Sequence, residues 1–197
     1  MLKQLLKNHN LILASGSPRR QKFFKDLELD FEIRLRPIDE IFPHHLKGSE
    51  ISDYLAKLKA AAFEGELKPG DILVTSDTIV WHKGMAINKP QDEADAIRMI
   101  KSLCNSTHEV ITSVCFKTVD QEILINDTTR VTFNDLNDEE ITYYVETHKP
   151  MDKAGAYGIQ DWIGLAGVTR VEGSYFNVMG LPVHLVYKTL KTIAEQS

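Results

Sequence analysis

Two arginines at the predicted start of a helix form the first group of residues with evident chemistry. An apolar strand over 11–14 leads into a short turn, and Ser17 is a good N-cap before a proline at the first helical position. A helix N-terminus presents unpaired N–H groups and a partial positive charge, so it attracts anions. Arg19 and Arg20 add two guanidinium groups whose geometry suits phosphate oxygens. The turn that begins at Ser15 therefore predicts a phosphate-binding corner.

Two carboxylates form the second group. Asp77 interrupts an apolar strand over 72–81, and aspartate is depleted in strands, so its presence needs a reason. It is either a strand residue bonded to the backbone or a carboxylate that takes a proton from water or binds a hard cation. Glu40 lies in an acidic loop, where a solvated charge is the simplest interpretation. Beside Asp77 it would become a second oxygen ligand for Mg²⁺, with substrate phosphates completing the shell.

Two lysines are candidates for binding phosphate. Lys59 lies at the edge of the apolar stripe of a helix predicted over 49–66, so it is either a ligand or a lysine that extends its ammonium into water. Lys89 precedes Pro90, where a third helix is predicted to start. It would present an ammonium beside that helix N-terminus, or be a plain surface charge.

The segment 151–160 combines charges, small residues and one amide. Small residues let the backbone approach a ligand closely, and Gln160 can form two hydrogen bonds with the edge of a nucleobase. The alternative is a structural pair between Asp152 and Lys153 followed by a glycine-rich turn. The residues alone leave both interpretations open.

Strands that alternate with helices early in the chain, and hairpins later, must position these groups. Helices are predicted over 18–29, 49–66, 90–104, 138–147 and 181–194, and strands over 11–14, 31–36, 72–81, 85–87, 108–119 and 122–133. Ser49 is predicted to cap the second helix, and glycines over 150–180 predict tight turns. The pattern indicates an α/β fold with a mixed sheet rather than a purely parallel one.

Size and composition narrow the class of protein. The 197 residues, 43% of them hydrophobic, suit a single domain over 1–197, with two lobes. A net charge of −5 and the lack of a basic stripe with interleaved aromatics argue against a nucleic-acid partner. The sequence has no signal-peptide core, no stretch of membrane-span length and two cysteines without paired spacing, so we expect a soluble cytoplasmic protein. It contains no Walker pattern, no zinc spacing and no evident hydrolase triad.

Six short motifs occur in one order along nearly the whole chain: Ser15-Gly16-Ser17-Pro18-Arg19-Arg20, Lys59-Ala60, Ser76-Asp77-Thr78, Lys89-Pro90, the run from Asp152 to Gln160, and Gly180-Leu181-Pro182. This ordered set resembles the Maf-like proteins, which are nucleoside triphosphate pyrophosphatases. The resemblance implies an elongated mixed β-sheet with flanking helices and two lobes around a central cleft, as in the inosine triphosphate pyrophosphatases. It also implies a reaction in which a nucleoside triphosphate and water give the monophosphate and pyrophosphate.

The resemblance also assigns roles to individual residues. It implies that Asp77 is the proton acceptor and that Arg19, Thr78 and Gln160 govern substrate choice. The segment that ends at Gln160 is similar to the branch acting on dTTP and UTP, whereas the sister branch acts on 7-methyl-GTP. The expected substrate-binding set is Ser15, Ser17, Arg19, Arg20, Lys59, Thr78, Lys89, Lys153 and Gln160, and the expected ligands of Mg²⁺ or Mn²⁺ are Glu40 and Asp77.

Some positions depart from the family's commoner pattern. Ser76 replaces alanine and Asn88 replaces glycine, while Cys104-Asn105 replaces Ser-Gly. Asp161 follows Gln160 where glycine is common, which would alter the loop beside the base pocket. Two alternatives stay open: a 7-methyl-GTP pyrophosphatase, and a nucleotide-sensing regulator of septum formation without strong catalysis. No membrane partner is expected, and a homodimer is left open.

Overall fold

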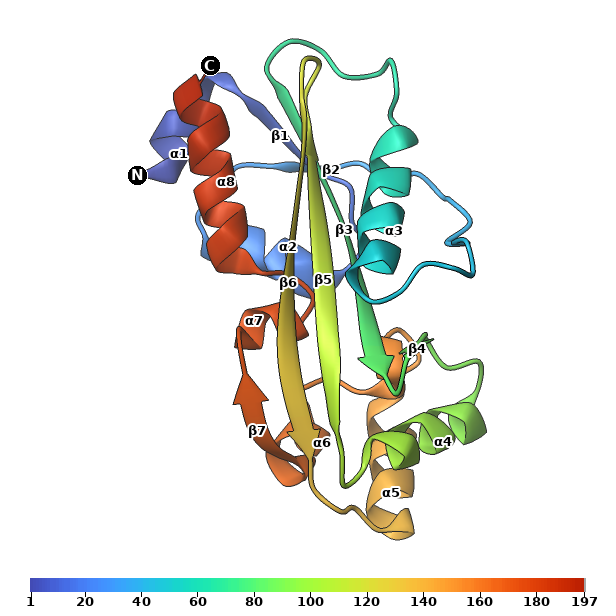
Figure 1. Cartoon of the computed structure of the whole chain (residues 1–197). Helices are drawn as coiled ribbons and strands as arrows, with labels where there is room; N and C mark the ends of the chain where they lie inside the picture. The colour runs from blue at the N-terminus through green and yellow to red at the C-terminus, as the bar shows by residue number, and fades with distance from the viewer. Residues whose placement is uncertain (197) are drawn as a thin grey trace. The chain divides into compact units, whose positions relative to one another are not determined.

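A mixed β-sheet with flanking helices forms the fold (Figure 1), and the computed structural model describes residues 1–196. Its strands are β1 (Asn10–Leu13), β2 (Glu32–Ile33), β3 (Asp71–His82), β4 (Met85–Ile87), β5 (Thr107–Lys117), β6 (Glu122–Phe133) and β7 (Val168–Glu172). Within the described residues they pair in the order β2-β1-β3-β5-β6-β7, and β4 pairs with β3. The strand β1 is parallel to β2 and β3, whereas the pairs β3–β4 and β6–β7 are antiparallel. The predicted mixed sheet is confirmed.

The helices vary widely in length. They are α1 (Leu2–Leu5), η1 (Leu6–Asn8), α2 (Pro18–Asp26), α3 (Ser49–Ala61), α4 (Glu93–Leu103), α5 (Asp138–His148), η2 (Ala154–Ala156), α6 (Trp162–Gly167), α7 (Tyr175–Val178) and α8 (Val183–Gln196), where η marks a 3₁₀ helix. None of the helices within residues 1–196 combines the length and the apolar character needed to span a bilayer.

The chain divides into two compact units. The first comprises residues 1–77, 112–127 and the chain from Gly180 onward, and the second comprises residues 78–111 and 128–179. The strands β3, β5 and β6 contribute residues to both units. Each unit has an apolar cluster made of its own residues.

In the first unit, the parallel pairing of β1 with β3 sets the position of the predicted phosphate-binding corner. Leu11, Ile12 and Leu13 are buried, and Leu13 lies opposite Val74 in the register. The run is apolar on both faces, as expected of a strand covered on each side. Against this sheet, α3 packs Ala56 and Ala60 in a cluster that also contains Ile12, Leu73, Phe63 and Cys115.

Three predictions about the ends of helices in the first unit were wrong. Gly48, with φ of +52°, is the N-cap of α3, so Ser49 is the first helical residue rather than the cap. The helix also ends at Ala61 instead of near residue 66. The helix α2 ends at Asp26 because Glu28 adopts a left-handed φ of +57°, which stops the helical path.

In the second unit, α4 and α5 pack around a core that contains Ile100, Tyr144 and Ile163. The helix α4 begins at Glu93 rather than near Pro90, because the Asp92 side chain accepts a hydrogen bond from the Asp95 N–H and caps it. The glycine-rich region predicted as turns contains η2, α6, β7 and α7. Helices this short have too few residues for a periodic apolar pattern, which is why the sequence did not indicate them.

Candidate active site

The Ser15 hydroxyl shapes the turn between β1 and α2. Its Oγ accepts a hydrogen bond from the Ser17 N–H at 3.3 Å, and its carbonyl accepts one from Gln21 Nε2 at 3.1 Å. Ser17 is the N-cap of α2, as predicted, but within the described residues its side chain makes no capping hydrogen bond. Side-chain bonds from Ser15 and Gln21, rather than a Ser17 cap, therefore hold the turn that precedes the helix N-terminus.

Arg20 connects the turn to two other segments of the first unit. Its Nε donates to the carbonyl of Gly180 at 2.7 Å, and its Nη1 donates to the carbonyl of Ser76 at 3.1 Å and to Ser15 Oγ at 3.5 Å. Burial lowers the pKa of Arg20 to about 10. The negative charge of Asp77 opposes this shift, and the positive charge of Arg19 adds to it. Arg20 therefore stays charged at neutral pH and fixes the main chain next to Asp77.

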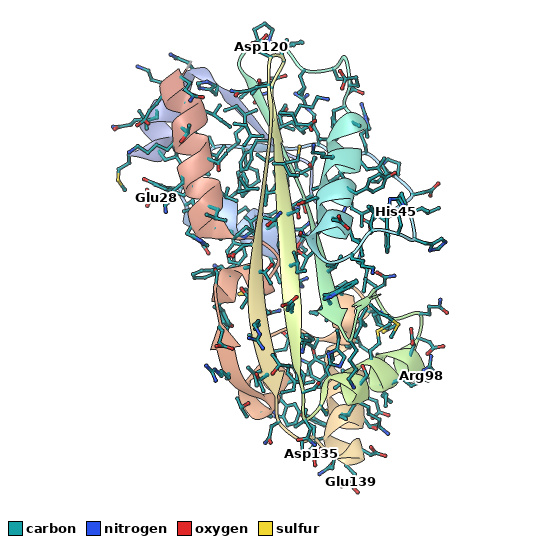
Figure 2. The ribbon with its side chains drawn as sticks, in the orientation of Figure 1. Glu28, His45, Arg98, Asp120, Asp135 and Glu139 are labelled. Atoms are coloured by element: carbon teal, nitrogen blue, oxygen red, sulfur yellow. The ribbon has the colours of Figure 1, made fainter. Side chains whose placement is uncertain are left out.

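Lys59 brings the two candidate carboxylates together. Its Nζ lies 2.6 Å from Asp77 Oδ1 and 2.8 Å from Glu40 Oε1, and it also donates to the Ser76 carbonyl at 3.4 Å. The side chains of Asp77 and Lys59 are 9% and 17% exposed, whereas that of Glu40 is 42% exposed. Asp77 is fixed on a strand and Lys59 on a helix, while Glu40 reaches them from the loop that continues to His45 (Figure 2).

Glu40 and Asp77 supply the oxygen donors that a hard divalent cation prefers. Within residues 1–196, no group of three or more His, Cys, Asp or Glu side chains is arranged to hold a metal ion. Magnesium, however, commonly uses one or two carboxylates and completes its shell with substrate phosphates and water. Both carboxylates lie within 2.8 Å of one ammonium, so their oxygens converge on one place. Two converging carboxylates fit a divalent cation that arrives with a phosphate-bearing ligand.

Of the other predicted site residues, Arg19 is half-buried on α2 in the first unit, and four lie in the second unit. Thr78 is half-buried on β3, and Lys89 is exposed before the Asp92 cap. The predicted helix start at Pro90 was wrong, so Lys89 does not directly precede α4, which begins at Glu93. Lys153 lies 2.7 Å from Asp152 Oδ1, so the predicted structural pair is present, and Gln160 is exposed.

The structure thus brings Ser15, Arg20, Glu40, Lys59 and Asp77 together through direct contacts within the first unit. Sequence reasoning missed two acceptors, the carbonyls of Ser76 and Gly180. Every residue has a backbone carbonyl, so the residue type does not show which carbonyls accept functional hydrogen bonds. The motif that begins at Gly180 was the one signal for this segment.

The comparisons with known proteins identify the family. A family model described as "Maf-like protein" matches residues 10–193, and the chain belongs to this family. A protein of Flavobacterium johnsoniae named "dTTP/UTP pyrophosphatase" is 64% identical over 98% of this chain and 100% of its own length. A protein of the same name from Christiangramia forsetii is 58% identical over 97% of each chain.

A solved structure supports the fold independently. The Staphylococcus aureus Ham1 protein is 14% identical, covers 93% of this chain and 99% of its own, and has a TM-score of 0.52. At that identity the likeness concerns the fold alone.

Proposed function

We propose that this chain is a nucleoside triphosphate pyrophosphatase that hydrolyses dTTP and UTP to the monophosphate and pyrophosphate. The observation that carries the proposal is the contact of Asp77 and Glu40 with the Lys59 ammonium, in the unit that also holds the N-terminus of α2. Family membership and the names of the close relatives support it. The reaction needs a base and positive charge on the phosphate oxygens. Asp77 can supply the base, and Lys59, Arg19 and the N-terminus of α2 can supply the positive charge.

In the proposed reaction, Asp77 accepts a proton from water. The water oxygen attacks the α-phosphorus as its proton passes to the Asp77 carboxylate, and the bond from that phosphorus to the bridging oxygen of the β-phosphate breaks. Arg19 and the N-terminus of α2 neutralise charge on the triphosphate, with Lys59. Arg20 supports the same step by holding the carbonyl of Ser76, next to Asp77. The leaving group is pyrophosphate.

Glu40 and Asp77 are proposed to hold Mg²⁺ or Mn²⁺. When bound, the cation would supply positive charge to the phosphate oxygens. Thr78, Lys89, Lys153 and Gln160 are proposed to contribute to substrate binding. A nucleoside triphosphate substrate also favours a cytoplasmic location.

The test is a substrate panel of dTTP, UTP and 7-methyl-GTP, assayed for pyrophosphate with Mg²⁺ or Mn²⁺ present. Release from dTTP and UTP is expected, and hydrolysis in ¹⁸O-labelled water should place the label in the monophosphate. Label in pyrophosphate would contradict attack at the α-phosphorus. A preference for 7-methyl-GTP would overturn the substrate assignment, and no release from any nucleotide would favour a nucleotide-sensing regulator.

A further inference from the structure

Asp161 stands at the N-cap of α6 but directs its carboxylate elsewhere. Within the described part of the chain, its side chain makes no capping hydrogen bond to its own helix. Aspartate at this position usually accepts from the first turn. Its Oδ2 instead accepts a hydrogen bond from the Tyr144 hydroxyl at 3.1 Å. The carboxylate is therefore held by another helix, α5, and is 19% exposed.

The Tyr144 hydroxyl joins both ends of the segment that precedes α6. It accepts a hydrogen bond from the Gly158 N–H at 3.0 Å and donates to Asp161, while the Asp161 N–H donates to the Gly158 carbonyl at 2.9 Å. Tyr144 is fully buried, and burial raises its pKa, so the hydroxyl keeps the proton that it donates. The two ends of the segment 158–161 are thus fixed by one buried side chain.

Lys153 supplies the positive charge nearest to this carboxylate. Its Nζ lies 4.0 Å from Asp161 Oδ2 and 2.7 Å from Asp152 Oδ1, and its side chain is 13% exposed. A half-buried carboxylate between a buried hydroxyl and an ammonium has a defined position. The Asp161 carboxylate can therefore act electrostatically on polar groups that lie close to it.

Gly158 makes room for two side chains over the segment. A Cβ at this position would lie 2.4 Å from Asp161 Oδ2 and 2.7 Å from Gln160 Nε2. The Gln160 amide nitrogen and the Asp161 carboxylate therefore both lie over Gly158, where the negative charge of the carboxylate favours the amide N–H groups over the amide oxygen. The reversed amide would bring its oxygen toward the same negative charge. Gln160 itself is exposed, so the remainder of the amide is available to a ligand.

Fixing this amide has a consequence for base selection. Uracil and thymine present an N3–H donor beside the O4 acceptor, whereas cytosine presents an N3 acceptor beside an N4 amino donor. A glutamine amide matches either pattern only in one of its two orientations. We propose, on the basis of the function proposed above, that Asp161 is a positioning residue that holds the Gln160 amide for uracil and thymine and against cytosine.

The test compares the kcat/KM ratio for UTP against CTP in the wild-type protein and in Asp161→Asn. The substitution keeps an oxygen that accepts from Tyr144 but removes the charge that orients Gln160. The ratio should fall by about tenfold, because the variant loses one interaction between a charged carboxylate and the Gln160 amide. Asp135→Asn is the matched control, because Asp135 is an exposed residue between β6 and α5 (Figure 2), and it should leave the ratio unchanged.

A second variant separates orientation from general damage. Tyr144→Phe keeps the Asp161 carboxylate but removes the hydroxyl that fixes its position, so it should also lower the ratio. A variant that merely destabilises the fold would lower both rates together. If wild-type protein releases pyrophosphate from UTP but Asp161→Asn keeps the wild-type ratio, the role of Asp161 is overturned. If the wild-type protein releases none from UTP or dTTP, the proposed function itself fails.

Discussion

Lys59 joins a buried and an exposed carboxylate in the first unit, whereas two tyrosine hydroxyls of the second unit are held in its apolar core. Tyr144 contacts Asp161, and Tyr157 lies 2.7 Å from His108 Nε2. Charges near solvent can exchange partners when a charged ligand binds. A buried network is altered only at the expense of packing. Substitutions in the first unit should therefore change turnover, and those in the second should change stability or selectivity.

Asp77→Asn should have the largest effect. It removes the group proposed to take the proton from water and leaves a side chain of nearly the same size on β3. Turnover of dTTP should fall by roughly a hundredfold or more, which corresponds to about 2.7 kcal/mol or more in the barrier. Pyrophosphate release with saturating divalent metal is the measurement.

The control for this variant is Asp120→Asn, at the exposed turn between β5 and β6 (Figure 2). It changes the net charge equally and should leave turnover unchanged. Near-normal turnover of Asp77→Asn would remove the assignment of Asp77 as the base.

Gly164→Ala should have the largest effect on the stability of the second unit. A Cβ at this position would lie 1.8 Å from the carbonyl oxygen of Ile159, so α6 would have to move away from the preceding loop. The free energy of unfolding should fall by about 1–3 kcal/mol. In Gly16→Ala, by contrast, the nearest atom is Leu35 Cδ1 at 3.8 Å, an ordinary contact. Equal urea midpoints for the two variants would contradict the difference.

The local features of the first unit could be predicted from sequence because they are contiguous. The strand, the turn and the proline at the first position of α2 follow one another, and each is a known local signal. The acceptor of Arg20 Nε could not be predicted, because Gly180 is 160 residues away and contributes a backbone carbonyl. The contact of Glu40 with Lys59 depends on the path of a loop without periodicity.

The second unit was harder to predict for a different reason. Tyr144 lies on a helix that the sequence indicated, but its hydroxyl partners, Gly158 and Asp161, lie in a segment predicted only as glycine-rich turns. Pro90 predicted the start of α4, whereas the Asp92 cap determines it. Pro90 and Asp92 are both local signals for a helix start, and the sequence alone does not show which of them the folded chain uses.

Lys59→Met tests whether the charges of the first unit act on turnover rather than on folding. The variant keeps the apolar stem but leaves Asp77 and Glu40 without the ammonium that both contact. Turnover should fall by about tenfold, or about 1.4 kcal/mol, because bonds to charged groups are worth that much or more. Lys59→Arg should retain part of the activity.

Lys57→Met, on the exposed face of the same helix, should match the wild type. A matching loss in Lys57→Met would mean that general charge, not this contact, is responsible.

His108 predicts a gradual effect of pH on stability. Burial lowers the pKa of His108 from 6.5 to about 3, and the neighbouring His82 adds to the shift. The unfolded chain therefore binds a proton between these pH values that the folded chain does not. Stability should be fully present above about pH 6.5 and should fall toward pH 3, by at most about 1.4 kcal/mol per pH unit from this residue.

His108→Gln isolates this contribution from that of the carboxylates, which also titrate on acidification. Urea midpoints of both proteins should be measured between pH 7 and pH 4. The variant removes the titrating ring and keeps a side chain that can bond to the Tyr157 hydroxyl. Its stability should therefore decline less steeply than that of the wild type. Parallel declines would mean that His108 is protonated in the folded protein, and that the core of the second unit tolerates a charge.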